Sequence, residues 1–140
     1  MASISVTTHY VSPPDDSLPP LALQITRLVG SYMLWVGMAE GGPERVGEAP
    51  LKGNLAKDWA CAMPSAAVSG AGAATALFRT SGSDVALSMA QRLAVRFKKQ
   101  IFLAVDIAPS FLTLGQGPRV LLEAERAIVT ELKALETNVS

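Results

Sequence analysis

The strongest constraint in this sequence is the run YMLWVGM at residues 32–38, which carries no charged residue. An extended segment turns alternate side chains to opposite faces of a sheet, so this run predicts a central strand that is apolar on both faces. Residues 101–107, IFLAVDI, form a second run of this kind, interrupted only by Asp106. Both runs require apolar material above and below the sheet.

Four further segments have the pattern of strands. Residues 4–11 and 21–29 alternate apolar and polar side chains, which is typical of strands with two different faces. A tight turn at Gly30-Ser31 makes residues 21–38 a predicted β-hairpin. Residues 57–63 and 73–78 are shorter candidates, the second weakened by its alanines.

Two proline- and glycine-containing stretches separate these strands. Residues 12–20 carry four prolines and two aspartates, so they can form neither a helix nor a central strand and are predicted to be a linker within the domain. Residues 39–54 have five glycines and prolines among their first twelve positions. This segment is predicted to be a long, flexible polar loop.

Two segments have the apolar periodicity of helices. In the first, which Ser83 or Asp84 is expected to cap, the apolar residues fall four apart. The second follows Gly117 and Pro118, which suit the first turn of a helix. The two apolar stripes are Val85, Met89, Leu93 and Phe97, and Leu121, Ala124, Ile128, Leu132 and Leu135.

The order of elements predicts the fold class. Five consecutive strands with short connections, then helix, strand and helix, indicate one α+β domain over residues 1–140. We expect a six-stranded, mainly antiparallel sheet with both helices packed on one face. Two helices can cover one face of such a sheet but not two, so the other face is expected to meet a partner chain. A charged fraction of only 17% agrees with an obligate partner.

No residue pattern predicts catalysis, a metal site or a cofactor site. The one histidine, His9, lies mid-strand on an expected outward face, and Cys61 is expected to be a buried small apolar residue. The segment SGAGAAT at 69–75 lacks the third glycine of a dinucleotide fingerprint and the lysine of a phosphate loop. Asp106, close before Pro109, is most simply a turn residue.

The composition also limits the class of partner and the compartment. Twelve basic and twelve acidic residues balance, which disfavours binding to nucleic acid or to an anionic membrane surface. A single cysteine favours an intracellular protein, and we find neither a secretory signal nor a membrane-spanning run. The expected location is the cytoplasm, with the nucleus as a further compartment.

Six residues are candidates for a protein interface. Trp35 and Trp59 lie in strands and serve either the core or, on an uncovered sheet face, as interface anchors. Arg92 and Arg96 form a modest basic patch with Lys98 and Lys99, and the two arginines are expected to face solvent or a client protein. Phe111 and Leu112 lie in an expected loop, residues 108–116, among small residues.

Several separate stretches resemble the proteasome assembly chaperone 4 family. They are LQITRL (23–28), YMLWVG (32–37), a strand ending in CAM (61–63), AQRLAVRFKKQIFLAVDI (90–107) and LLEAERAIVTELK (121–133). The similarity extends over about residues 20–135. The sequence departs from the family in the length of segment 39–54 and in the Gly/Ala-rich segment 66–76.

The resemblance implies a non-catalytic chaperone without a cofactor. Such a protein pairs with proteasome assembly chaperone 3, and the heterodimer binds α-type subunits and promotes formation of the α-ring of the proteasome core particle. Two alternatives from other classes stay open. One is a small-molecule-binding protein or enzyme subunit with a cleft near 69–75 and Asp106, and the other is a scaffold domain of another intracellular complex.

Overall fold

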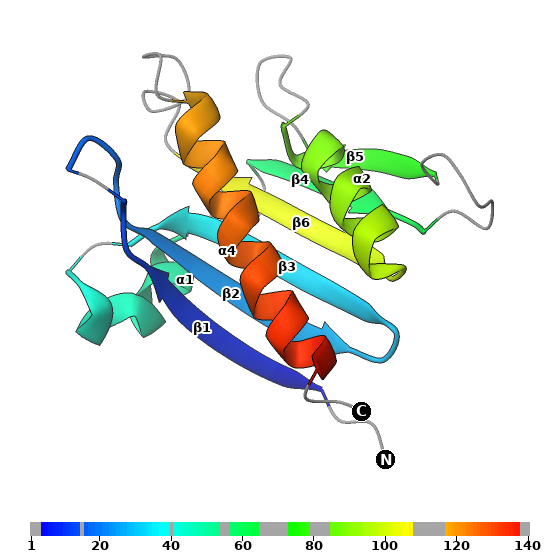
Figure 1. Cartoon of the computed structure of the whole chain (residues 1–140), viewed down its shortest axis with the longest axis horizontal. Coiled ribbons are helices and arrows are strands. Elements are labelled where there is room, and N and C mark those ends of the chain that lie inside the picture. The colour runs from blue at the N-terminus through cyan, green and yellow to red at the C-terminus, as the bar shows by residue number, and fades with distance from the viewer. Residues whose placement is uncertain are drawn as a thin grey trace.

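The computed structural model describes residues 4–14, 16–39, 41–53, 57–64, 73–78, 85–107 and 117–137. Six strands form one sheet in the order β1-β2-β3-β6-β4-β5 (Figure 1). Their bounds are β1 Ser5–Val11, β2 Leu21–Leu28, β3 Ser31–Met38, β4 Asp58–Ala62, β5 Ala74–Phe78 and β6 Gln100–Asp106. The α+β prediction is confirmed, with every predicted strand present.

The sheet is mixed. Four of its strand pairs are antiparallel, as expected, but β3 and β6 run parallel, with Ser31 opposite Gln100. The cause is the connection between β5 and β6. This connection contains helix α2 (Val85–Phe97), and after it β6 runs in the same direction as β5. Strand β6 is inserted into the sheet between β3 and β4. Periodicity along the chain cannot predict this insertion.

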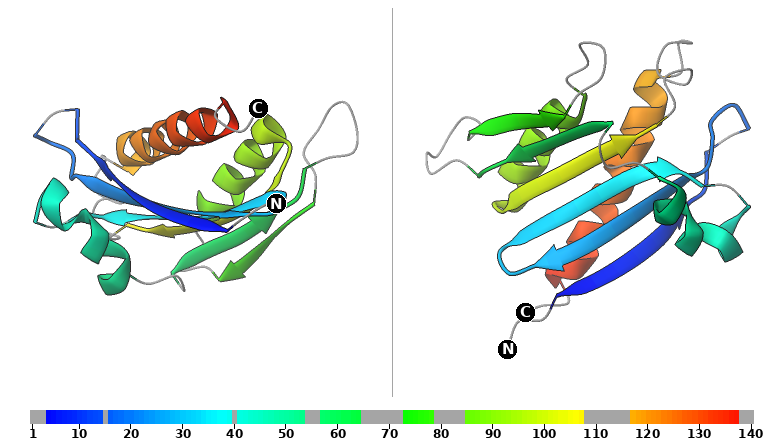
Figure 2. Two further views of the ribbon diagram at one scale, coloured as in Figure 1. Left: turned by 90° about the horizontal axis from the view of Figure 1, so that it is seen from below. Right: turned by 180° about the vertical axis from the view of Figure 1, so that it is seen from behind.

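Two helices cover one face of the sheet, as predicted (Figures 1 and 2). Helix α2 packs on β4 and β6, and helix α4 (Gly117–Thr137) contacts β2. Both predicted apolar stripes face the sheet and enclose the main core. Its largest fully buried side chains include Leu23, Ile25, Leu34, Met89, Leu93, Ile101, Leu103, Ile128 and Leu132.

A polar network fastens the last turns of α4 to the sheet. The hydroxyl of Tyr32, in β3, donates to Oε2 of Glu136 at 3.0 Å. Nζ of Lys99, just before β6, pairs with Oε1 of the same carboxylate at 3.1 Å. Tyr32 is only 1% exposed. Burial, followed by the hydrogen bond to Glu136, raises the pKa of Tyr32 to about 12.

This network predicts a loss of stability at high pH. Below pH 10 the phenol is protonated in both states, and Tyr32→Phe should cost about 1 kcal/mol for the lost hydrogen bond. Between pH 10 and 12 the unfolded chain loses this proton while the folded chain keeps it, so the wild-type advantage should disappear as pH rises. Urea unfolding at pH 7, 10 and 11 measures this. Tyr10→Phe is the control, and parallel pH profiles of wild type and Tyr32→Phe would contradict the prediction.

Residues 39–54 differ from the predicted loop. Their described part forms a 3-10 helix, η1 (Pro43–Glu48), and one turn of α-helix, α1 (Ala49–Lys52). Figure 2 shows both on the face of the sheet opposite α2 and α4, which we call the far face. Val46 and Ala49 pack there in a second cluster around Trp35. Pro43 and Pro50 stand in the first turns of these helices, so prolines taken as loop signals are helix-start residues here.

His9 also differs from its predicted outward position. Its side chain lies on the helix-covered side, where Nδ1 is 3.4 Å from Oε2 of Glu131 on α4. The alternation of β1 was predicted correctly, but the more polar of its two sets of side chains lies on the side of the sheet that α4 covers. The more apolar half, with Tyr10, packs toward the second cluster. The predicted cap residues Ser83 and Asp84 lie outside the described residues.

Candidate functional site

The far face carries an exposed apolar patch beside η1 and α1. Strand pairing places Thr26, Met33, Phe102 and Cys61 in one row across the sheet. Val6, Met63 and Leu77 share this face and are 56%, 45% and 44% exposed. Met33, Cys61 and Phe102 are partly exposed. We call Val6, Met33, Cys61, Met63, Leu77 and Phe102 the far-face patch.

Charge is distributed very unequally between the two sides of the molecule. Among the described strand residues that point to the far face, Asp106 is the only charged one. The outer surfaces of α2 and α4, by contrast, expose many charged side chains, among them Arg92, Arg96, Arg119, Arg126 and Lys133. Depletion of charge is characteristic of the centre of a protein interface. The far face is therefore the stronger candidate for a stable contact, and the helix side for a solvated or transient one.

Trp35 lies on the far face under η1 and α1 and is only 4% exposed. Two glycines make room for its ring. A Cβ on Gly37 would overlap Cζ2 of the indole and lie 2.6 Å from Cη2, and a Cβ on Gly53 would lie 2.9 Å from Cε2. Gly53 follows α1, so the short helix is seated directly against the indole. Both glycines are required by this close approach.

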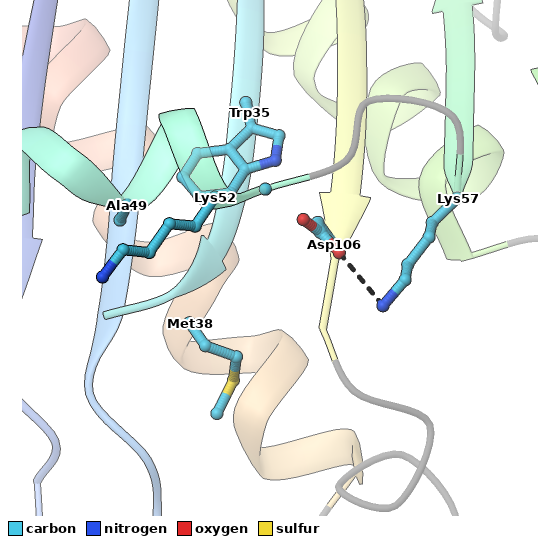
Figure 3. A pocket seen from close by; sticks show the side chains of 7 residues that line it. Trp35, Met38, Ala49, Lys52, Lys57 and Asp106 are labelled. Atoms are coloured by element: carbon cyan, nitrogen blue, oxygen red, sulfur yellow. Dashed lines mark ion pairs between the residues drawn. The ribbon is translucent and has the colours of Figure 1, made fainter. Parts of the chain in front are cut away.

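A cavity of about 220 Å³ opens beside Trp35 (Figure 3). Its wall includes Lys52, Lys57 and Asp106. Asp106 is the last residue of β6 and is not the predicted turn residue. It is 9% exposed and its Oδ1 lies 3.3 Å from Nζ of Lys57. Strand β6 (Gln100–Asp106) ends within the predicted run 101–107, and Asp106 is still paired with Gly37 of β3, so this carboxylate belongs to the sheet and not to a turn.

Trp59 lies on the same row as Trp35, since both face Ala104 of β6 from neighbouring strands. Trp59 is partly exposed and packs against the second cluster. The Nε1 atoms of Trp35 and Trp59 are both buried, and neither has a hydrogen-bond acceptor among the described residues. Cys61, two positions after Trp59, is half-buried and accepts a 3.3 Å hydrogen bond from Nε2 of Gln100.

The predicted basic patch lies on the opposite, helix-covered side. Arg92 is 56% exposed at its side chain and makes a bidentate contact with Glu125 of α4, in which Nη2 lies 2.6 Å from Oε1. These hydrogen bonds raise the pKa of Arg92. Arg92 therefore joins α2 to α4. Arg96, one turn later, lines a surface groove of about 360 Å³ with residues of α4 that include Leu122 and Val129.

Some predicted features lie outside the described residues, namely Phe111, Leu112 and positions 69–72 of the glycine-rich segment. Within the described ranges, no group of three or more His, Cys, Asp or Glu side chains could hold a metal ion. None of the described helices is long and apolar enough to span a membrane.

Sequence reasoning predicted an apolar sheet face without helical cover but did not identify the residues that form it. Met33 and Phe102 were assigned only to strands that are apolar on both faces, and Lys57 was not considered. The signal was present, because Met33 and Trp35 are two residues apart and must share a face. The missing information was which face the two helices cover.

Comparison with known proteins gives this face a context. The family model described as proteasome assembly chaperone 4 matches residues 20–107. The chain belongs to the proteasome assembly chaperone 4 family. The match extends from just before β2 to just after β6. It therefore contains five of the six strands and most of the far-face patch of this proteasome assembly chaperone 4 family member.

The fold is similar to that of a solved chaperone. A chain in the crystal structure of a chaperone complex for yeast 20S proteasome assembly aligns with a TM-score of 0.58 and 16% sequence identity. The alignment covers 98% of both chains, so the two proteins share the fold over their whole length. No curated protein sequence matches the chain significantly.

Proposed function

We propose that this chain is a non-catalytic assembly chaperone that pairs with proteasome assembly chaperone 3. In the cytoplasm, and also in the nucleus, the pair binds α-type subunits and promotes formation of the α-ring of the proteasome core particle. The observation that carries the proposal is the far-face patch in a member of this family. Six apolar side chains share a sheet face whose described strands hold one charged residue, and a folded partner can remove them from water.

The extent of helical cover supports a partner with a sheet of its own. Helices α2 and α4 cover one side, and η1 with α1 covers only the end of the far face around Trp35. The rest of that face is broad and follows the strands, which suits face-to-face packing of a second sheet about 10 Å away. The similar fold found in a solved assembly-chaperone complex agrees with this use.

Co-expression tests the proposal. The tagged chain should be recovered as a one-to-one complex with proteasome assembly chaperone 3 from the same organism, and the complex should retain purified α-type subunits on the resin. The tagged chain without its companion should retain less. Failure of the two chains to co-purify, when each is folded by circular dichroism, would refute the proposal.

We place the client surface on the helix side, at the basic patch, and keep Phe111 and Leu112, which lie outside the described residues, as further candidate client contacts. Arg96 offers an exposed guanidinium for an acidic client segment, because it has no ion pair among the described residues. Arg92 is engaged with Glu125, so its contribution is to hold the two helices together beside the groove.

The double substitution Arg92→Ala/Arg96→Ala should weaken capture of α-type subunits about tenfold without affecting pairing with the partner. The stability of the chain should fall by no more than about 1 kcal/mol, because the lost Arg92–Glu125 pair is largely exposed. Binding of α-subunits to the purified complex measures the first effect and urea unfolding the second. Lys133→Ala, on the exposed face of α4, is the control, and undiminished capture by the double variant would contradict this surface.

A further inference from the structure

The far face holds two buried hydrogen-bond donors that the described part of the chain does not satisfy. Nε1 of Trp35 and Nε1 of Trp59 are both buried. Among the described residues, no hydrogen-bond acceptor lies within reach of either nitrogen. A buried N–H without an acceptor is costly and rare in folded proteins. Two on one face, with Ala104 between their strands, indicate that the face is completed by an outside chain that carries acceptors.

The cavity beside Trp35 indicates which acceptor fits. Its volume of about 220 Å³ is below the range of roughly 300–1,000 Å³ usual for drug-sized ligands, and suits a single side chain. Figure 3 shows Lys57 pointing toward Asp106, and Lys52 extending past Trp35 toward Ala49, away from that pair. Lys57 pairs with Asp106. Lys52 has no ion pair among the described residues, so the cavity has a net charge of +1.

We propose that the partner chain seated on the far-face patch inserts an acidic side chain into this cavity, where its carboxylate accepts a hydrogen bond from Nε1 of Trp35. A second acceptor from the same partner surface meets Nε1 of Trp59. Lys52 and Lys57, which both line the cavity, give it the positive charge that attracts the carboxylate. This proposal rests on the proposed pairing and adds a polar anchor to an otherwise apolar interface. The enclosed position makes that anchor specific, since a partner without the carboxylate leaves the indole N–H unpaired.

The two tryptophans allow a direct measurement, because the chain contains only these two indoles. In ¹⁵N-labelled protein the two indole N–H resonances should move downfield and exchange more slowly with solvent when proteasome assembly chaperone 3 is added to saturation. If the partner binds and neither resonance changes, this proposal is wrong although the pairing stands. If the partner does not bind, the proposed function fails and this proposal with it.

An isosteric replacement separates the hydrogen bonds from the packing. β-(3-benzothienyl)alanine at position 35 or 59 keeps the ring shape and removes the N–H donor. We expect a partner affinity about tenfold lower, with a melting temperature of the isolated chain that is unchanged or higher, because an unsatisfied donor has been removed. Unchanged affinity at both positions would overturn the proposal.

Charge reversal and free anions identify the acceptor. Lys52→Glu should lower partner affinity five- to tenfold, and less at high salt, whereas Lys133→Glu on α4 should not. Acetate alone, without a partner, should leave the Trp35 resonance in place at millimolar concentration. If acetate shifts the Trp35 resonance and the partner does not, the cavity binds a free carboxylate. That result would contradict the proposal that a side chain of the partner enters it.

Discussion

The substitution Phe102→Asp should lower the affinity for the partner chaperone by roughly 100-fold or more. Phe102 is in the middle of the far-face row, opposite Met33 on one side and Cys61 on the other. A central aromatic side chain typically contributes 2 kcal/mol or more to an interface, and an aspartate at this position would bury an unpaired charge on binding. Isothermal titration with the purified partner measures the change.

The effect should be confined to the complex. Phe102 is partly exposed in the single chain, so an aspartate there stays in contact with water and the chain remains folded. Leu122→Asp is the matched control, since Leu122 is 49% exposed on the helix side. If Leu122→Asp reduces pairing as much as Phe102→Asp does, the partner does not bind through the far face.

The second large effect is expected on stability. Gly37→Ala should destabilise the chain by about 1–3 kcal/mol, because the new methyl group would overlap the buried ring of Trp35. Trp35 cannot move away easily, since Gly53 and α1 close the space behind it. For a chain of this size the melting temperature should fall by roughly 4–12 °C. Thermal unfolding followed by circular dichroism provides the measurement.

Two comparisons isolate the cause of that loss. Gly47→Ala is the control, because no atom outside its neighbours lies within 4 Å of the position of its Cβ. In a Trp35→Ala background, Gly37→Ala should cost almost nothing, since the overlapping ring is gone. An equal cost in both backgrounds would show that the penalty comes from the strand backbone and not from Trp35.

Sequence reasoning predicted the parts of this molecule that depend on periodicity. The alternation of apolar and polar residues, together with the apolar runs, predicted all six strands. The helical spacing of apolar residues, such as Met89 and Leu93, predicted both long helices and the side of each that is buried. The apolar run at 32–38 predicted cover on both faces, and on the far face the chain itself covers Trp35 but leaves Met33 partly exposed. The nature of that cover was not predictable, because Val46 and Ala49 lie in a segment whose glycines and prolines suggest a loop.

The features that sequence reasoning could not supply depend on contacts between distant residues. Asp106 became part of a cavity wall because Lys57 and Gly53, from another part of the chain, lie beside it. Arg92 was expected to face solvent or a client, and its salt bridge depends on the position of Glu125 on α4. A local pattern gives the face on which a side chain lies. It does not give the neighbour that a separate element brings there.

The insertion of β6 between β3 and β4 has a consequence for synthesis on the ribosome. Ser31 of β3 is opposite Gln100 of β6 in the finished sheet. The edge of β3 therefore stays unpaired until about half of the chain more has been synthesised. Val6 and Met33 lie on one side of that gap, and Cys61, Met63 and Leu77 on the other. A half-made chain therefore lacks the continuous surface, and a companion that needs all of it would associate only with molecules whose translation has passed residue 106.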